Sequence, residues 1–186
     1  MLIGYLRVNP TDACTLPRII KKEMHPLEED QVSAFLKEVQ GNPHEYLYKI
    51  ALFTGLREGE VLGLGWEHID LENGILTVKR QLRKEQKKGG QYYFSPPKNN
   101  RARSISLAPS VVLLFRLQKL EQNSMRMEAG DAWQENGLVF SNQTGGYLSY
   151  RTVYDCFKRI VKKIGSQATR FHDLRHTYAV ACIKRH

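Results

Sequence analysis

The stretch HEYLYKIALFTGLREGEVLGL, residues 44–64, holds the strongest local structural signal in the chain. Residues 44–54 are apolar on nearly every side, which is typical of a helix buried in a core. Gly55 follows, and glycine readily adopts the left-handed conformation in which many helices end. A short helical segment around Glu60 comes next. The sequence therefore predicts two successive helices, with Arg57 just after the end of the first.

Four other segments are expected to be helical. One follows the acidic residues 28–30 and ends at Gly41, because its apolar residues recur at helical spacing. A second opens at Pro109, which suits the first turn of a helix. A third follows Ser149, a residue type that caps helices, and carries a strong apolar stripe. The last begins near His172.

Strand signals lie in the middle of the chain. Asn73-Gly74 separates two apolar runs, residues 69–71 and 75–78, and this dipeptide is typical of a tight hairpin turn. Alternation over residues 103–107 predicts a third strand. A long, basic, glycine-containing excursion, residues 84–98, precedes that strand. The expected fold class is α+β and mainly α, a helical domain with a small antiparallel sheet on one side.

The overall charge favours a nucleic-acid partner. The 186 residues include 28 Lys and Arg against 19 Asp and Glu, a net charge of +9 that attracts polyanions. No apolar run approaches the roughly 18 residues of a membrane-spanning helix, and the first residues lack a signal peptide's pattern. We therefore expect a cytoplasmic protein with no membrane partner. The cysteines fit neither a metal knuckle nor a disulfide framework, so we expect reduced core residues at Cys14, Cys156 and Cys182.

Two arginines and a histidine have the chemistry to hold a phosphodiester. Negative charge accumulates on the phosphoryl oxygens when a further oxygen attacks phosphorus, so fixed cations stabilise the transition state. Arginine suits this role because its planar fork can hold two oxygens and stays protonated. Arg57 supplies one such group. His172 and Arg175 are three residues apart, so they share a face if their segment is helical.

These residues lie in motifs that resemble a known family. Residues 51–64, followed by Trp66 and Ile69-Asp70, look like the first arginine box of the tyrosine recombinases, the phage-integrase family. The stretch HDLRHT, residues 172–177, resembles their HxxR box, and PKNNRARSISL, residues 97–107, resembles the hairpin that carries their catalytic lysine. Three motifs in family order are far more specific than one. The resemblance implies the fold of the DNA breaking-rejoining enzymes. It also implies site-specific DNA recombination or integration through a 3′-phosphotyrosyl intermediate, without metal or other cofactor.

The resemblance also implies roles for individual residues. Arg57 and Arg175 would bind non-bridging oxygens of the scissile phosphate, and His172 would contribute to phosphate binding and proton transfer. Lys98 would protonate the leaving 5′ oxygen, and nearby arginines would lower the pKa of its ammonium group and make it a better acid. Glu60 would orient an arginine. The implied partners are double-stranded DNA and, at full length, further copies in a homo-tetramer on DNA, with no small-molecule substrate.

Several other side chains have both a functional and an ordinary interpretation. His176 is expected to line the site or to stabilise the turn. It lies at zinc-ligand spacing from His172, but Arg175 between them would repel a cation, so no metal is expected. Lys84, Lys87 and Lys88 are alternatives to Lys98 as the general acid. The basic excursion could contact duplex DNA or face solvent. The candidate DNA contacts are Lys87, Lys88, Arg101 and Arg103.

The chain divides into a lead-in and one compact unit. Residues 1–24 contain prolines and a basic run, so we expect a linker or the tail of an upstream core-binding domain. Residues 25–186 are expected to form the catalytic domain, incomplete at its C-terminus, because the family places its tyrosine nucleophile downstream of the HxxR box. Tyr178 shares helical spacing with the expected core positions Ala181 and Cys182, so it is not expected to be that nucleophile.

On its own, then, the chain is expected to bind DNA without cleaving it. A nucleophile-free DNA-binding protein that occupies sites or modulates an active recombinase is the alternative. A general basic domain for RNA or DNA is a third interpretation, but it leaves the arginine and HxxR motifs unexplained.

Overall fold

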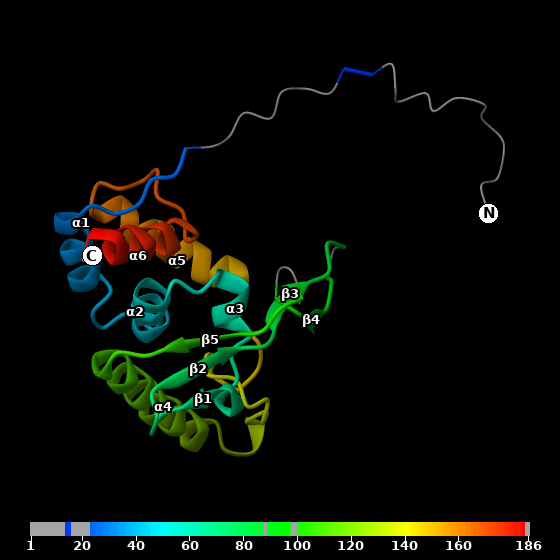
Figure 1. The fold of residues 1–186 in the computed structure, drawn as a ribbon. Coiled ribbons are helices and arrows are strands. Elements are labelled where there is room, and N and C mark those ends of the chain that lie inside the picture. The colour runs from blue at the N-terminus through cyan, green and yellow to red at the C-terminus, as the bar shows by residue number, and fades with distance from the viewer. Residues whose placement is uncertain (1–13, 16–22, 88, 98–99, 185–186) are drawn as a thin grey trace.

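The computed structural model describes residues 14–15, 23–87, 89–97 and 100–184 (Figure 1). Its helices are α1 (Glu29–Glu38), α2 (Glu45–Thr54), α3 (Glu58–Leu62), α4 (Pro109–Ala129), α5 (Tyr150–Lys163) and α6 (Asp173–Lys184), with short 3-10 helices at Trp66–His68 and Gly130–Ala132. Its strands are β1 (Ile69–Asp70), β2 (Ile75–Val78), β3 (Gln81–Lys84), β4 (Tyr92–Ser95) and β5 (Arg103–Ser106). The expected class, mainly helical with a small antiparallel sheet, is confirmed.

Helix α2 lies at the centre of the helical part and contacts both α4 and α6 (Figure 1). It is buried on most sides, as its apolar sequence predicts. Tyr48 of α2 packs with its ring centroid 6.3 Å from that of Phe35 in α1 and 6.0 Å from that of Phe157 in α5. The Tyr48 hydroxyl donates a hydrogen bond to the Val153 carbonyl at 2.7 Å, which satisfies the polar atom of this buried ring.

The main sheet has the order β1-β2-β5, and both pairs are antiparallel. Leu76 of β2 pairs with Ile69 on one side and with Ile105 on the other. Gly74 in the β1–β2 turn has a φ of +64°, which a glycine adopts without strain. The predicted hairpin and the predicted third strand are therefore confirmed.

A second hairpin, for which the sequence predicted no strands, leads into and through the basic excursion. Strand β3 pairs antiparallel with β4, and in Figure 1 this hairpin projects from the body of the molecule. Leu82 of this hairpin is buried, whereas Tyr93 and Phe94 are exposed. The Arg80 guanidinium lies over the Phe94 ring, 4.1 Å from its centroid. The sequence did not reveal the hairpin because β4 has no alternation of buried and exposed residues.

Ser149 is the N-cap residue of α5, as expected, although its side chain makes no capping hydrogen bond. Two other local expectations are wrong. Cys156 is buried, whereas Cys14 and Cys182 are exposed, so the cysteines are not all core residues. Ala181 is also exposed, because α6 buries side chains only in its first turns. Among the residues described, no helix combines the length and the hydropathy that crossing a membrane requires.

Candidate active site

The backbone on both sides of Arg57 is set by helix ends. Helix α2 ends at Thr54, and Gly55 takes a left-handed φ of 62° while its N–H donates to the Ala51 carbonyl at 3.1 Å. Leu56 is buried, and Arg57 then occupies the N-cap position of α3. The predicted junction therefore exists, and it holds Arg57 between two helices.

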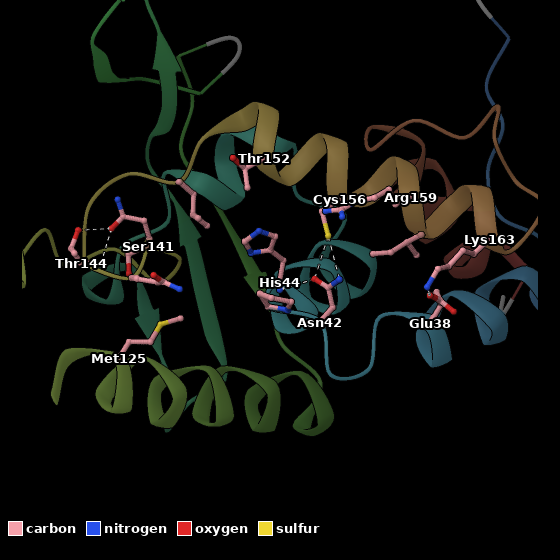
Figure 2. A pocket seen from close by; sticks show the side chains of 15 residues that line it. Glu38, Asn42, His44, Met125, Ser141, Thr144, Thr152, Cys156, Arg159 and Lys163 are labelled. Atoms are coloured by element: carbon pink, nitrogen blue, oxygen red, sulfur yellow. Dashed lines mark hydrogen bonds and ion pairs between the residues drawn. The ribbon is translucent and has the colours of Figure 1, made fainter. Parts of the chain in front are cut away.

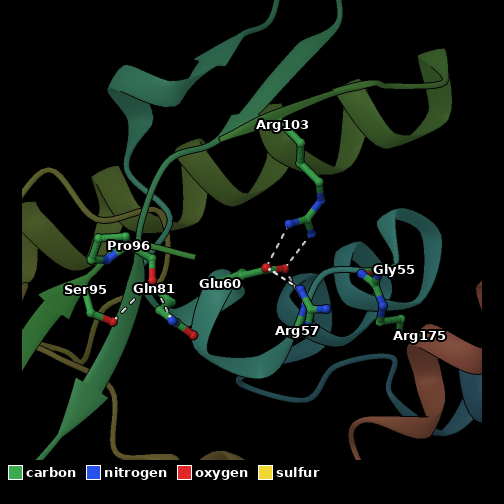
Figure 3. A network of polar contacts seen from close by, with 8 residues as sticks. All are labelled: Gly55, Arg57, Glu60, Gln81, Ser95, Pro96, Arg103 and Arg175. Atoms are coloured by element: carbon green, nitrogen blue, oxygen red, sulfur yellow. Dashed lines mark hydrogen bonds and ion pairs between the residues drawn. The ribbon is translucent and has the colours of Figure 1, made fainter. Parts of the chain in front are cut away.

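Glu60 is the acceptor around which the site is organised (Figure 3). Its carboxylate is almost completely buried, with 1% of the residue exposed. It accepts the Arg57 backbone N–H at 2.9 Å and the Arg57 Nη1 at 3.0 Å, as the third residue of a helix often does for the N-cap. Arg103 of β5 binds the same carboxylate from the sheet, with Nη1 at 2.8 Å from Oε1 and Nη2 at 2.6 Å from Oε2.

These contacts keep Glu60 ionised. Burial by itself raises the pKa of the carboxyl group, but hydrogen bonds from Arg103 and Arg57 outweigh it and bring the pKa to about 2. Between pH 5 and 8 Glu60 therefore carries a full negative charge inside the protein. Two arginines share that charge.

Arg175 of α6 joins the cluster from the other end of the chain. It donates a hydrogen bond from Nη1 to the Gly55 carbonyl, two residues before Arg57. Burial lowers the pKa of Arg175, and the charges of Arg57 and Arg103 lower it further, which places three guanidinium groups within electrostatic reach of one another. Figure 3 shows Arg175 beside Arg57, with Arg103 on the far side of Glu60.

The two histidines of the HxxR segment lie next to this cluster. His172 immediately precedes α6, and its ring centroid is 5.1 Å from that of His176, edge to face. Partial burial lowers the pKa of His172, and His176 and Arg57 lower it further, which favours the neutral imidazole. Within the described part of the chain no group of three or more His, Cys, Asp or Glu residues is placed to hold a metal ion.

The other candidate residues are distributed differently. Lys98 and Lys88 lie outside the described residues. Lys87 is exposed near the tip of the β3–β4 hairpin and pairs with Glu85 at 3.0 Å. Arg101 is exposed just before β5. Arg103 was expected to face DNA phosphates or water, but its guanidinium is instead bound to Glu60, which the sequence did not indicate.

The profile described as the Phage integrase family matches residues 25–186. The chain belongs to this family, the tyrosine recombinases.

The relatives include a tyrosine recombinase, a prophage integrase and a transposon integrase. The XerC-like tyrosine recombinase of Caldanaerobacter subterraneus subsp. tengcongensis is 27% identical over 201 residues, covering 98% of this chain and 51% of that protein. The prophage integrase IntR of Escherichia coli is 26% identical over 191 residues, covering 95% of this chain and 45% of the relative. The Tn1549 transposon integrase, solved in complex with transposon right end DNA, has a TM-score of 0.74 at 25% identity over 97% of this chain and 60% of its own. The chain thus spans about half the length of the curated relatives it matches.

This integrase-family chain also contains a cavity of about 820 Å³ between the α1–α2 link, α4 and α5 (Figure 2). Asn42 contacts the buried Cys156 thiol there at 3.2 Å, and Lys163 forms an ion pair with Glu38 at one end. None of the residues that line this cavity belongs to the arginine cluster. The cavity is therefore separate from the candidate phosphate site.

Sequence reasoning missed two ion pairs of this integrase site. Asp173 is fully buried and binds Arg170 through Nε at 3.0 Å and Nη2 at 2.8 Å, which anchors the start of α6. The spacing of three residues between them is a recognisable signal of such a pair. Glu60 and Arg103 are 43 residues apart, so no local pattern connects them.

Proposed function

We propose that this chain forms the phosphate-binding part of the active site of a site-specific DNA recombinase or integrase. The enzyme cuts and rejoins double-stranded DNA through a 3′-phosphotyrosyl intermediate. The observation that carries the proposal is the convergence of Arg57, Arg103 and Arg175 beside one carboxylate. Three cations and one anion leave two positive charges for a phosphate. The solved integrase–DNA complexes and the net charge of +9 support DNA as the partner.

In this proposal Arg57 and Arg175 bind the non-bridging oxygens of the scissile phosphate. Arg57 is tied to Glu60 by one side-chain nitrogen while 33% of its side chain remains exposed, so it is held and still accessible. Arg175 is similarly anchored on the Gly55 carbonyl. Because both groups are fixed before DNA arrives, they stabilise the added negative charge of the transition state without reorganising.

Proton transfer falls to His172 and Lys98. A neutral His172 can hold a proton on one ring nitrogen and accept one on the other, and its position beside Arg57 lets it contact the same phosphate. Lys98 would protonate the leaving 5′ oxygen, because it occupies the lysine position of the family motif.

Tyr178 is not the attacking tyrosine in this proposal. It lies in α6 and is packed against Gly55 so closely that a Cβ there would be 2.6 Å from its ring. That packing holds the ring against the end of α2. Four copies would act together on two DNA segments, as the family resemblance implies.

A nicked duplex that loses a short fragment on cleavage tests the proposal. We would use the longest protein that the gene encodes across this chain and measure its covalent adduct with DNA. Wild-type protein should form the adduct, and Arg57→Ala should slow adduct formation about 100-fold or more, as loss of one transition-state donor typically does. Arg126→Ala, which removes an exposed arginine paired with Glu135, should have no effect. Equal adduct formation by Arg57→Ala would exclude the mechanism.

The second candidate is a nucleophile-free DNA-binding protein that occupies sites or modulates an active recombinase. The same experiment separates the two. DNA binding without any adduct would support the binding protein. The salt dependence of binding would not separate the two, because phosphate neutralisation dominates in both.

A further inference from the structure

We propose that Arg103 is a positioning residue, which holds Glu60 so that Glu60 in turn holds Arg57 against the scissile phosphate. The inference rests on the proposed function, because the phosphate is the ligand for which Arg57 is positioned. It gives Arg103 a role other than direct contact with DNA.

The geometry of the Glu60 contacts distinguishes the two arginines. Arg103 engages both carboxylate oxygens with two nitrogens, at 2.8 and 2.6 Å, which fixes the distance and the plane of the carboxylate together. Arg57 reaches the same group with one side-chain nitrogen, at 3.0 Å. Arg103 therefore orients the acceptor, and Arg57 bonds to an acceptor that is already oriented. Both terminal nitrogens of Arg103 donate to Glu60, so the end of its side chain faces the carboxylate.

The elements that carry the two arginines also support a positioning role for Arg103. Arg103 lies on β5, where it pairs with Val78 of β2 in the core-facing sheet. Helix α3 has only five residues, too few to be stable by itself. The ion pair between Arg103 and Glu60 thus links the short helix α3 to the sheet. In this way the sheet fixes the position of Arg57, which caps α3.

The neighbouring Glu58 indicates how the pKa of Glu60 would change without Arg103. Glu58 is also in α3 and partly buried, no arginine binds it among the described residues, and burial raises its pKa to about 7. A protonated Glu60 would be a weak acceptor for Arg57. Arg103 therefore supplies both the orientation of the carboxylate and much of the charge that keeps it ionised.

A double-mutant cycle of Arg103→Lys and Arg57→Ala tests the role, with adduct formation on the nicked duplex as the readout. Lysine keeps the charge of Arg103 but loses the fork. With Arg57 present, Arg103→Lys should slow adduct formation roughly tenfold, because coupled neighbours behave non-additively. In the Arg57→Ala background the same change should have less than about a twofold effect. The matched control Arg126→Lys, in the exposed pair with Glu135, should change neither rate.

A second readout needs no catalysis. The Glu60 carboxyl carbon can be titrated by NMR in the chain itself, and Arg103→Lys should raise the pKa of Glu60 while Arg126→Lys leaves it unchanged. A variant that misfolds would show a lower melting temperature rather than a shift confined to the Glu60 pKa. Lysine at position 103 keeps the positive charge, so Arg103→Lys is less disruptive than a neutral substitution.

The outcomes separate the two hypotheses. If wild-type protein forms the adduct but Arg103→Lys slows it equally in both backgrounds, Arg103 acts independently of Arg57 and the inference is wrong, while the proposed function stands. If wild-type protein binds DNA and forms no adduct, both fall. An unchanged Glu60 titration in Arg103→Lys also overturns the inference.

Discussion

At the scale of single residues, Glu58 and Glu60 show how position sets the charge of one side-chain type. Both belong to α3, where Glu60 is almost completely buried and Glu58 is partly buried. Two arginines bind Glu60 and keep its pKa at about 2. Glu58 has a buried Oε1 without a hydrogen-bond partner among the described residues, and its pKa rises to about 7. The carboxyl next to Arg57 in the chain is therefore largely protonated below neutral pH, and the functional carboxylate two positions on is not.

Glu58 should make the stability of the fold depend on pH. The unfolded chain releases this proton near pH 4.5, whereas the folded protein keeps it until about pH 7. The folded state binds more protons in that window, so the free energy of unfolding should fall as pH rises from about 4.5 to 7 and stay level above. At about 1.4 kcal/mol per pKa unit, the loss is up to about 3 kcal/mol.

Urea unfolding of wild type and of Glu58→Gln at pH 5 and pH 8 measures this effect. The glutamine variant should lose less stability between the two pH values, by about 2 kcal/mol, because its side chain stays neutral. The difference between the proteins removes the contribution of the histidines. Parallel pH dependence of both proteins would show that Glu58 is not the titrating group.

Glu60 affects stability only at lower pH, since its stabilisation is lost as pH falls from about 4.5 through about 2.

At the scale of elements, the link from α2 to α3 decides how three helices meet. Gly55 ends α2, and its carbonyl accepts a hydrogen bond from Arg175 of α6. Because Gly55 has no side chain, the Tyr178 ring can pack against it. One residue thus joins the segment that carries Arg57 to the helix that carries Arg175. A side chain at this position is disfavoured twice, by the left-handed φ of 62° and by the ring.

Gly55→Ala should therefore destabilise the protein by about 2–4 kcal/mol, the sum of backbone strain and overpacking. Gly41→Ala is the matched control, because Gly41 has a φ of +74° but an added Cβ would meet no packed neighbour within 4 Å. It should cost only about 1–2 kcal/mol from its backbone conformation. Chemical denaturation of both variants gives the comparison. Equal losses of unfolding free energy in the two variants would mean that the Tyr178 ring moves aside at no cost. The contact between α2 and α6 would then not depend on this glycine.

At the scale of the whole molecule, a segment near the start of the described chain is fastened to the helix that bears the HxxR motif. Leu27 is buried, and its N–H donates to the Thr177 hydroxyl of α6 at 2.9 Å. Thr169 donates to the His25 carbonyl at 3.1 Å, and Arg170 reaches the Glu23 carbonyl at 3.3 Å. Residues 23–27 therefore lie against α6 and the segment just before it, although about 150 positions separate Leu27 from Thr177 in the sequence.

Thr177→Val tests this contact, because valine keeps the shape of threonine but leaves the buried Leu27 N–H without its acceptor. The loss should be about 1–3 kcal/mol in global stability, the usual cost of an unsatisfied buried donor. Hydrogen exchange at the Leu27 amide should accelerate with it. Thr77→Val is the control, since the Thr77 hydroxyl contacts Ser104 at an exposed site, and it should cost less than about 0.5 kcal/mol. Unaltered exchange at Leu27 in Thr177→Val would show that another group satisfies this amide.

Local features of the sequence determined most of the elements of this protein. The end of α2 at Gly55, the Asn73-Gly74 turn and the start of α4 at Pro109 follow from backbone preferences that act over a few residues. The motifs around Arg57 and Arg175 were equally visible, because each is contiguous. The β3–β4 hairpin was missed, since its strands carry no buried face of their own apart from Leu82.

Only the tertiary structure decided how those motifs combine. Arg103 meets Glu60 across 43 residues, Arg175 meets Gly55 across 120, and Leu27 meets Thr177 across 150. An ion pair or a single hydrogen bond between distant segments imposes no periodicity on either one, so it leaves no local trace. What brings the partners together is burial of the apolar faces of α2, α6 and the sheet, and the polar groups carried with those faces must then pair with one another.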